Sequence, residues 1–318
     1  MEKLVYQMFI SGTGDCLERA LLKGLGGVIF FTKDIQTKEQ FTNLIQQIVN
    51  KSLFPPFLSI DQEGGRVERT ENLHKRYLSP KFAFEKGKDF LKQQTEQIAS
   101  ELREYGINLN FAPCADVNTN PNNPIIGERA FSNNTMGVIE GVGIVSETYR
   151  NNNIIPCVKH YPGHGDASKD SHLTLPVIDL PFETMKQIHI APFEAAVKNN
   201  IEMIMAAHLH CTCFDKSTMP SSLSKNAIGY LRNNLKYNGV IISDDMVMKG
   251  VQDYGATDAI IMGIKAGLDM FIYREMDKNT YDTINEVVKI VAQDEDLTKS
   301  VIKSNERIRQ LKEKYNIM

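Results

Sequence analysis

The side chains best suited to chemistry are concentrated in one stretch, residues 159–172, with the sequence KHYPGHGDASKDSH. Its proline and two glycines disrupt helical periodicity, so we predict a long loop that follows an apolar strand. His172 follows Asp170 by two residues, which is close enough for the carboxylate to hold one ring nitrogen while the other exchanges a proton. The stretch therefore predicts an acid/base pair on a loop.

Other polar side chains follow the predicted strands. Asp244 comes after the apolar residues 240–242, so its carboxylate is the candidate nucleophile or charge stabiliser. A carboxylate with a separate acid/base group is what retaining glycoside hydrolysis requires. Five charged or polar side chains are suited to orienting a ligand rich in hydroxyl groups. They are Asp61, Arg69, Arg129, Lys159 and His160.

Eight short apolar segments alternate with segments of helical periodicity, which predicts a closed parallel (β/α)8 TIM-type barrel. No linker divides the chain, so we expect one domain over residues 1–318. In such barrels the active site lies at the C-terminal ends of the strands. The predicted strands are residues 4–10, 26–31, 57–60, 109–115, 154–158, 203–207, 240–242 and 268–273.

The composition is that of an ordinary globular protein, with 42% hydrophobic and 24% charged residues and a net charge of −3. This charge gives no reason to expect nucleic acid or an anionic membrane as a partner. We find no signal peptide and no apolar run of about 18 residues, so we expect a cytoplasmic monomer. The five cysteines are expected to be reduced thiols, and Cys211 and Cys213 lack the two-residue gap of a zinc or redox pair.

Several motifs, in order, resemble those of the NagZ-type β-N-acetylglucosaminidases of glycoside hydrolase family 3. The resemblance extends over roughly residues 4–275 and contains small departures, with Tyr161 in place of the usual phenylalanine and Glu128 in place of a common aspartate. The matching segments are 61–69 (DQEGGRVER), 111–118 (FAPCADVN), 126–131 (IGERAF), 159–165 (KHYPGHG), 170–172 (DSH), 207–208 (AH) and 243–246 (SDDM).

The resemblance implies a role for each matching residue. Asp244 corresponds to the nucleophile that forms a covalent glycosyl-enzyme, His172 to the general acid/base, and Asp170 to the carboxylate that orients it. The implied reaction is hydrolysis of terminal β-linked N-acetylglucosamine with retention, from cell-wall muropeptide fragments, without a cofactor or metal. Residues implied to bind the sugar, with His208 close by, are Asp61, Arg69, Arg129, Lys159 and His160.

Alternatives remain open from the sequence. Asp245 could face the site in place of Asp244, and His164 is interpreted as a structural histidine packed against its own loop. Phosphorolysis could accompany or replace hydrolysis. A protein that binds sugar without catalysing a reaction is a further alternative. A metal-dependent hydrolase is disfavoured because no known zinc motif is present. Its candidate ligands would be His160, His164, Asp166, Asp170, His172, His208 and His210.

Overall fold

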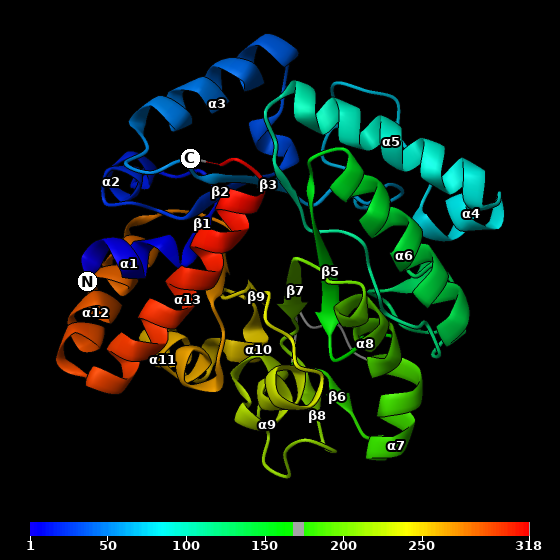
Figure 1. The fold of residues 1–318 in the computed structure, drawn as a ribbon. Helices are drawn as coiled ribbons and strands as arrows, with labels where there is room; N and C mark the ends of the chain where they lie inside the picture. The colour runs from blue at the N-terminus through cyan, green and yellow to red at the C-terminus, as the bar shows by residue number, and fades with distance from the viewer. Residues whose placement is uncertain (168–174, 318) are drawn as a thin grey trace.

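The computed structural model describes residues 1–167 and 175–317. Within these ranges, eight parallel strands close into a barrel in the order β1-β10-β9-β7-β5-β4-β3-β2. Helices surround the barrel (Figure 1), so the predicted (β/α)8 architecture is confirmed. No helix in the described ranges is long and apolar enough to cross a bilayer.

The barrel strands are short, and a separate two-stranded parallel sheet lies outside the barrel. The barrel strands are β1 (Phe9–Ser11), β2 (Gly27–Phe30), β3 (Phe57–Ile60), β4 (Leu109–Asn110), β5 (Ile155–Tyr161), β7 (Met203–Ala206), β9 (Val240–Asp245) and β10 (Met270–Tyr273). The small sheet, which the sequence did not lead us to predict, pairs β6 (Val177–Ile178) with β8 (His210–Cys211).

Helices occupy most of the connections between the barrel strands. The α-helices are α1 (Glu2–Gln7), α2 (Leu17–Leu22), α3 (Lys38–Lys51), α4 (Pro80–Glu85), α5 (Lys88–Glu104), α6 (Thr135–Asn151), α7 (Phe182–Thr184), α8 (Ala191–Lys198), α9 (Lys225–Gly229), α10 (Lys249–Gln252), α11 (Ala256–Ala266), α12 (Lys278–Gln293) and α13 (Glu295–Lys314). Single 3-10 turns are η1 (Thr32–Asp34), η2 (Gly127–Arg129) and η4 (Ser221–Leu223), and π-helical segments are η3 (Met185–Ile190) and η5 (Tyr230–Asn234).

Two strand predictions were wrong in extent. The predicted strand at residues 4–10 is split, because α1 buries Val5 and Tyr6 on a helical face and β1 begins only at Phe9. An apolar run this short fits either periodicity, so its pattern does not separate helix from strand. The predicted strand at 109–115 is regular only over β4, since Pro113 has no N–H to donate to a neighbouring strand.

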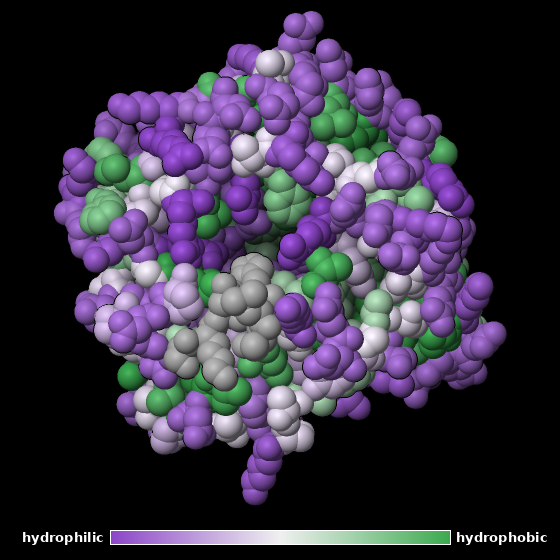
Figure 2. Space-filling model, turned by 180° about the vertical axis from the view of Figure 1, so that it is seen from behind, coloured by the Kyte–Doolittle hydropathy of each residue, from purple (hydrophilic) through white to green (hydrophobic). Residues whose placement is uncertain are grey.

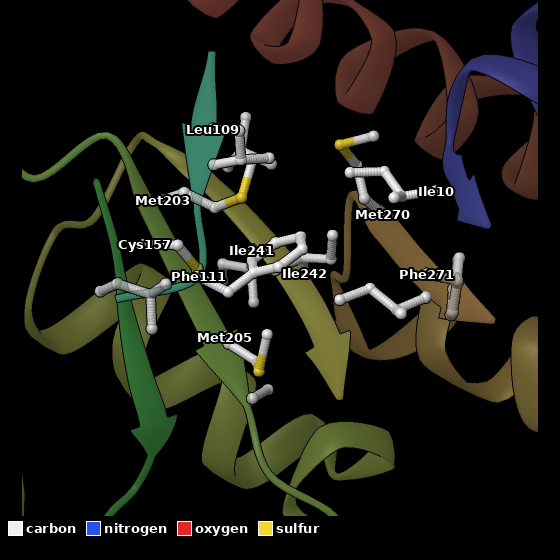
Figure 3. Close-up of a cluster of buried hydrophobic side chains, with 14 of the residues drawn as sticks. Ile10, Leu109, Phe111, Cys157, Met203, Met205, Ile241, Ile242, Met270 and Phe271 are labelled. Atoms are coloured by element: carbon white, nitrogen blue, oxygen red, sulfur yellow. The ribbon is translucent and has the colours of Figure 1, made fainter. Parts of the chain in front are cut away.

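Apolar side chains from many strands fill the core (Figure 3). Each fully buried aliphatic side chain contributes roughly 1.5–3 kcal/mol relative to an exposed one, so this core holds the strand ends in fixed positions. The labelled side chains in Figure 3 are Ile10, Leu109, Phe111, Cys157, Met203, Met205, Ile241, Ile242, Met270 and Phe271.

The strand register brings the predicted site segments to one level. β5 pairs with β7 through Tyr161 and Ala206, and β7 pairs with β9 through Ala206 and Ser243. Lys159 on β5 and Asp244 on β9 therefore both lie toward the C-terminal end of the barrel, as the parallel arrangement requires.

Candidate active site

A cavity of about 680 Å³ lies at the C-terminal ends of the barrel strands. Hydrophilic residues surround a central hollow on the face shown in Figure 2, in agreement with the many charged side chains that line the cavity. Most of the predicted site residues in the described ranges meet there. These are Asp61, Arg69, Arg129, Lys159, His160 and Asp244.

An alternating network of buried charges forms one part of the wall. The Lys159 Nζ lies 2.7 Å from an Asp61 carboxylate oxygen and 2.6 Å from Glu63 Oε1. Arg129 donates to both Glu63 oxygens, at 2.9 and 2.8 Å. Burial alone would raise the pKa of Glu63, but Arg129 and Lys159 outweigh it and hold that pKa well below its usual range. Glu63 thus fixes two of the predicted sugar-binding cations.

His160 is held at both ring nitrogens. Arg129 Nη2 lies 3.2 Å from Nε2, and because a guanidinium only donates, Nε2 is the acceptor. Nδ1 therefore carries the proton and donates to Asp116 Oδ2 at 2.7 Å. Burial would raise the pKa of Asp116, yet His160 and the backbone N–H of His164 keep that pKa well below its usual range. The His160 ring is consequently fixed in one orientation.

Asp244 and Asp245 both line the cavity, but their carboxylates have different surroundings. Asp245 forms an ion pair with Arg274 and accepts the Val247 N–H at 3.1 Å. Burial raises the pKa of Asp245 despite these contacts. For Asp244, burial is outweighed by His160, then His208, the Asp245 backbone N–H and Lys159, so its pKa is lowered. Of the two carboxylates, only that of Asp244 has a lowered pKa.

His208 lies behind the cavity wall. It is 1% exposed and is not among the residues that line the cavity. Its Nδ1 lies 2.7 Å from the Ser222 hydroxyl and its Nε2 lies 3.1 Å from the Asp244 carbonyl oxygen. Because a carbonyl only accepts, Nε2 carries the proton and Nδ1 accepts from Ser222. In this structure His208 contacts the backbone of the candidate nucleophile.

His164 combines a structural backbone with a ring at the cavity. Its backbone N–H donates to Asp116 Oδ1 at 2.6 Å, as expected of a residue that shapes the loop. Its ring lines the cavity, and neither ring nitrogen has a hydrogen-bond partner among the described residues. Burial lowers the pKa of the ring, so it is neutral near pH 7. The interpretation of His164 as purely structural therefore accounts for its backbone and not for its ring.

Two groups that matter to the site received no role from the sequence. Glu63 lies within the 61–69 motif, yet a single sequence does not reveal that it pairs with cations 66 and 96 positions away. Arg274 follows the last barrel strand, and its position beside Asp245 depends on the pairing of β10 with β9. From the sequence, Asp116 was recognised only as a polar residue at the end of a predicted strand. That position correctly predicted its place at the C-terminal end of the barrel.

Asp170 and His172, the predicted acid/base pair, lie outside the described residues. Their roles therefore stay predictions.

One group with the spacing of metal ligands occurs in the described ranges, formed by Cys114, Asp116 and His160. Hydrogen bonds account for its short distances, since the Cys114 thiol and His160 Nδ1 both donate to Asp116 Oδ2, at 3.1 and 2.7 Å. Burial raises the pKa of Cys114 well above its usual value, so its sulfur stays protonated. This donor set fits a protonated hydrogen-bond cluster better than a cation site, for which the thiol must ionise.

A parallel eight-stranded barrel with carboxylates and cations at the C-terminal strand ends belongs to the TIM-barrel class of enzyme scaffolds. Sequence comparison makes this more specific. Residues 12–311 match the family described as "Glycosyl hydrolase family 3 N terminal domain", and the chain belongs to that family.

Similar proteins carry related names. The chain is 34% identical over 274 residues to "Beta-hexosaminidase A" of Pseudoalteromonas piscicida, a match covering 77% of this chain and 45% of that protein. It is 32% identical over 257 residues to "Beta-hexosaminidase" of Methylococcus capsulatus, covering 78% and 75% respectively.

A solved structure of a glycoside hydrolase family 3 β-N-acetylglucosaminidase from Paenibacillus sp. str. FPU-7 superposes with a TM-score of 0.93. The sequences are 27% identical, and the match covers 100% of this chain and 63% of that one. The chain thus spans less than half of one of these three relatives, about three quarters of another and under two thirds of the third.

Proposed function

We propose that this protein is a retaining β-N-acetylhexosaminidase that removes terminal β-linked N-acetylglucosamine. The proposal is supported by the family, by the names of its relatives and by the set of charged groups at the barrel rim. One observation carries it: the Asp244 carboxylate lines the cavity with a lowered pKa, while the carboxylate of Asp245 is engaged by Arg274.

In the proposed first step, a carboxylate oxygen of Asp244 attacks the anomeric carbon and the bond to the leaving oxygen breaks. His172, oriented by Asp170, gives its proton to that oxygen; both roles rest on the sequence resemblance. In the second step, His172 takes a proton from water, whose oxygen displaces Asp244 from the anomeric carbon. Two inversions give net retention, and both steps pass through an oxocarbenium-like state.

The buried network would bind the sugar ring. Asp61 supplies an acceptor, while Lys159, Arg129 and His160 are preoriented by Glu63 and Asp116. Prior fixing of these side chains lowers the entropy lost when substrate binds. Arg69 also lines the cavity, with its guanidinium 5.7 Å from the centre of the Phe31 ring.

Cell-wall fragments are the proposed natural substrates. Besides Arg69, the cavity is lined by Lys33, Arg66 and Arg274, of which Arg66 donates to the Pro124 carbonyl and Arg274 is paired with Asp245. These cations suit a leaving group that bears carboxylates, such as a muramic acid residue with its lactyl group and peptide. The same cations would also suit inorganic phosphate, which makes phosphorolysis the second candidate. Assays with and without phosphate separate the two by the product, a free sugar or a sugar 1-phosphate.

The nucleophile is tested by comparing Asp244→Asn with Asp245→Asn on an aryl β-N-acetylglucosaminide. We expect Asp244→Asn to lower kcat by about a thousandfold or more, because the covalent step is lost. Asp245→Asn removes a partner of Arg274 and should cost much less. A fluorinated sugar analogue that traps the intermediate should label the peptide at Asp244, and labelling elsewhere would reject the assignment.

A further inference from the structure

Cys211 is the last residue of β8, and Cys213 lies on the tight turn that follows it. The backbone N–H groups of Phe214 and Asp215 both donate to the Cys211 carbonyl oxygen, at 3.1 and 3.3 Å. Consecutive Cα atoms are about 3.8 Å apart, so residues two apart in a tight turn can meet the Cα separation of about 4.4–6.8 Å that a disulfide requires. The turn thus places the two cysteines at a backbone separation that permits a disulfide despite the unusual C-x-C spacing.

The two thiols differ in acidity and in access to solvent. Cys211 is 1% exposed, whereas Cys213 is partly exposed. The neighbouring Cys211 lowers the pKa of Cys213 despite burial, and Cys213 together with burial raises the pKa of Cys211 well above its usual value. A partly exposed cysteine with a lowered pKa therefore lies two residues from a buried cysteine with a raised pKa.

Both cysteines also act electrostatically on the Tyr161 phenol. Burial is the main cause of the raised pKa of Tyr161, and Cys211 and Cys213 are among the groups that add to it. The other three cysteines differ, because Cys16, Cys114 and Cys157 are all buried. Burial raises the pKa of both Cys114 and Cys157. Redox-sensitive cysteines are typically accessible, acidic and next to a second thiol that can resolve the oxidised form.

We propose that Cys211 and Cys213 form a reversible dithiol–disulfide site that hydroperoxides oxidise. The Cys213 thiolate attacks the peroxide O–O bond and becomes a sulfenic acid, and the other peroxide oxygen leaves as hydroxide, or as alkoxide from an organic hydroperoxide. Cys211 then attacks the Cys213 sulfur, an S–S bond forms, and water leaves with the Cys211 proton. In total, two thiols and one molecule of hydrogen peroxide give a disulfide and two waters.

The position of the pair connects it to the cavity wall. The chain runs from His208 through the two cysteines to Ser222, whose hydroxyl holds the His208 ring. The backbone N–H groups of Ser221 and Ser222 donate to the carbonyls of Leu209 and Ala207, at 2.7 and 3.1 Å. The pair therefore lies within a closed loop that begins and ends beside His208. The proposal does not depend on the proposed hydrolase activity.

Peptide mapping tests the site directly. Trypsin releases residues 199–216 as one peptide with these two cysteines and no other. After treatment of the full chain with hydrogen peroxide, we expect this peptide to lose the mass of two hydrogens and a thiol reductant to restore it. Cys213 should react with peroxide about tenfold faster than Cys16 or faster still.

Variants identify the two roles. Cys211→Ser should leave a sulfenic acid on Cys213 that dimedone traps, whereas Cys213→Ser should leave Cys211 as a thiol. Cys16→Ser is the matched control and should oxidise as the native protein does. If a Cys211 variant fails to fold, as judged by circular dichroism, the native peptide measurement still decides. The proposal is overturned if Cys213 reacts no faster than Cys16, or if it accumulates sulfinic acid without the disulfide.

Discussion

At the level of single residues, adjacent aspartates on β9 have opposite pKa shifts because their partners differ. His160, the Asp245 backbone N–H and Lys159 stabilise the charge on Asp244, whereas burial dominates at Asp245 even with Arg274 beside it. Two carboxylates with separated pKa values are a recurring property of catalytic sites. The sequence predicted the pair but could not choose between its members, because that choice depends on side chains from β5 and from the connection after β7.

Removing the Glu63 charge should destabilise the protein and weaken substrate binding. Glu63→Gln leaves Arg129 and Lys159 buried with less compensation, and breaking such a buried pair costs about 3–5 kcal/mol. Urea denaturation measures the free energy of unfolding, and KM for an aryl N-acetylglucosaminide should rise. Glu183→Gln, on an exposed residue, is the control and should change neither quantity. An unchanged unfolding free energy in Glu63→Gln would contradict the structural role.

The sequence predicted that His208 lies close to the bound sugar. In the structure it contacts the backbone of Asp244, so we expect its removal to slow the chemical step. His208→Ala removes the N–H that holds the Asp244 carbonyl, so the nucleophile should lose its alignment. We expect kcat to fall about ten- to a hundredfold with little change in KM, since small displacements of reacting groups cost this much. Steady-state kinetics give both constants. A raised KM with unchanged kcat would instead support direct contact with substrate.

At the level of elements, the loop after β5 is docked closely on the loop after β4. Asn123 Nδ2 donates to the His164 carbonyl at 2.9 Å, and the Asn120 N–H donates to the Gly165 carbonyl at 3.3 Å. A Cβ on Gly165 would lie only 1.8 Å from the Val117 carbonyl oxygen. Glycine is therefore required here by the close approach of two backbones.

Gly165→Ala should separate these loops and lower both stability and activity. Overpacking of this kind typically costs about 1–3 kcal/mol, and His160 and His164 should shift with the loop. Thermal unfolding and kcat/KM provide the measurements. Gly143→Ala is the matched control: it lies in α6 with no atom within 4 Å of the added Cβ. It should stabilise the protein by about 0.5–1 kcal/mol. If Gly165→Ala and Gly143→Ala had the same stability and the same kcat/KM, the close approach of Gly165 to the Val117 carbonyl would be contradicted.

The elements also show what a sequence can and cannot predict. Strands such as β2, β3 and β9 were predicted because their apolar runs are dense, and polar residues directly after them marked the correct rim. α1 was missed because seven apolar-rich positions satisfy two periodicities. The pairing of Glu63 with Arg129 and Lys159 joins the connection after β3, the connection after β4 and strand β5, so it depends on the pairing of these strands and no local pattern encodes it.

At the level of the whole molecule, buried titratable groups should make stability depend on pH in two stages. Burial lowers the pKa of His164, His189 and His208, so they stay neutral in the folded state while the unfolded chain takes up protons. Their stabilising contribution is complete above the unfolded pKa of about 6.5 and is lost as pH falls below it. The lowered pKa values of Glu63 and Asp116 act likewise below about pH 4.5.

We therefore expect the urea midpoint to decline below about pH 6.5 and to fall more steeply below about 4.5. Each buried histidine contributes at most about 1.4 kcal/mol per pH unit. His189→Gln should reduce the slope of the urea midpoint against pH between pH 6.5 and 5. The steeper fall below about pH 4.5 should be unchanged. A slope that is the same in this variant would show that His189 does not contribute.

The first and last helices, α1 and α13, lie on the same side of the molecule (Figure 1), where Lys312 and Gln7 are in contact at 2.9 Å and Asn305 donates to the Leu4 carbonyl at 2.8 Å. A short peptide could therefore connect them, and new ends could be opened in the surface turn between α12 and α13. Such a circular permutant would keep every strand in the same spatial order around the barrel. Its hydrolytic rate should match that of the native chain.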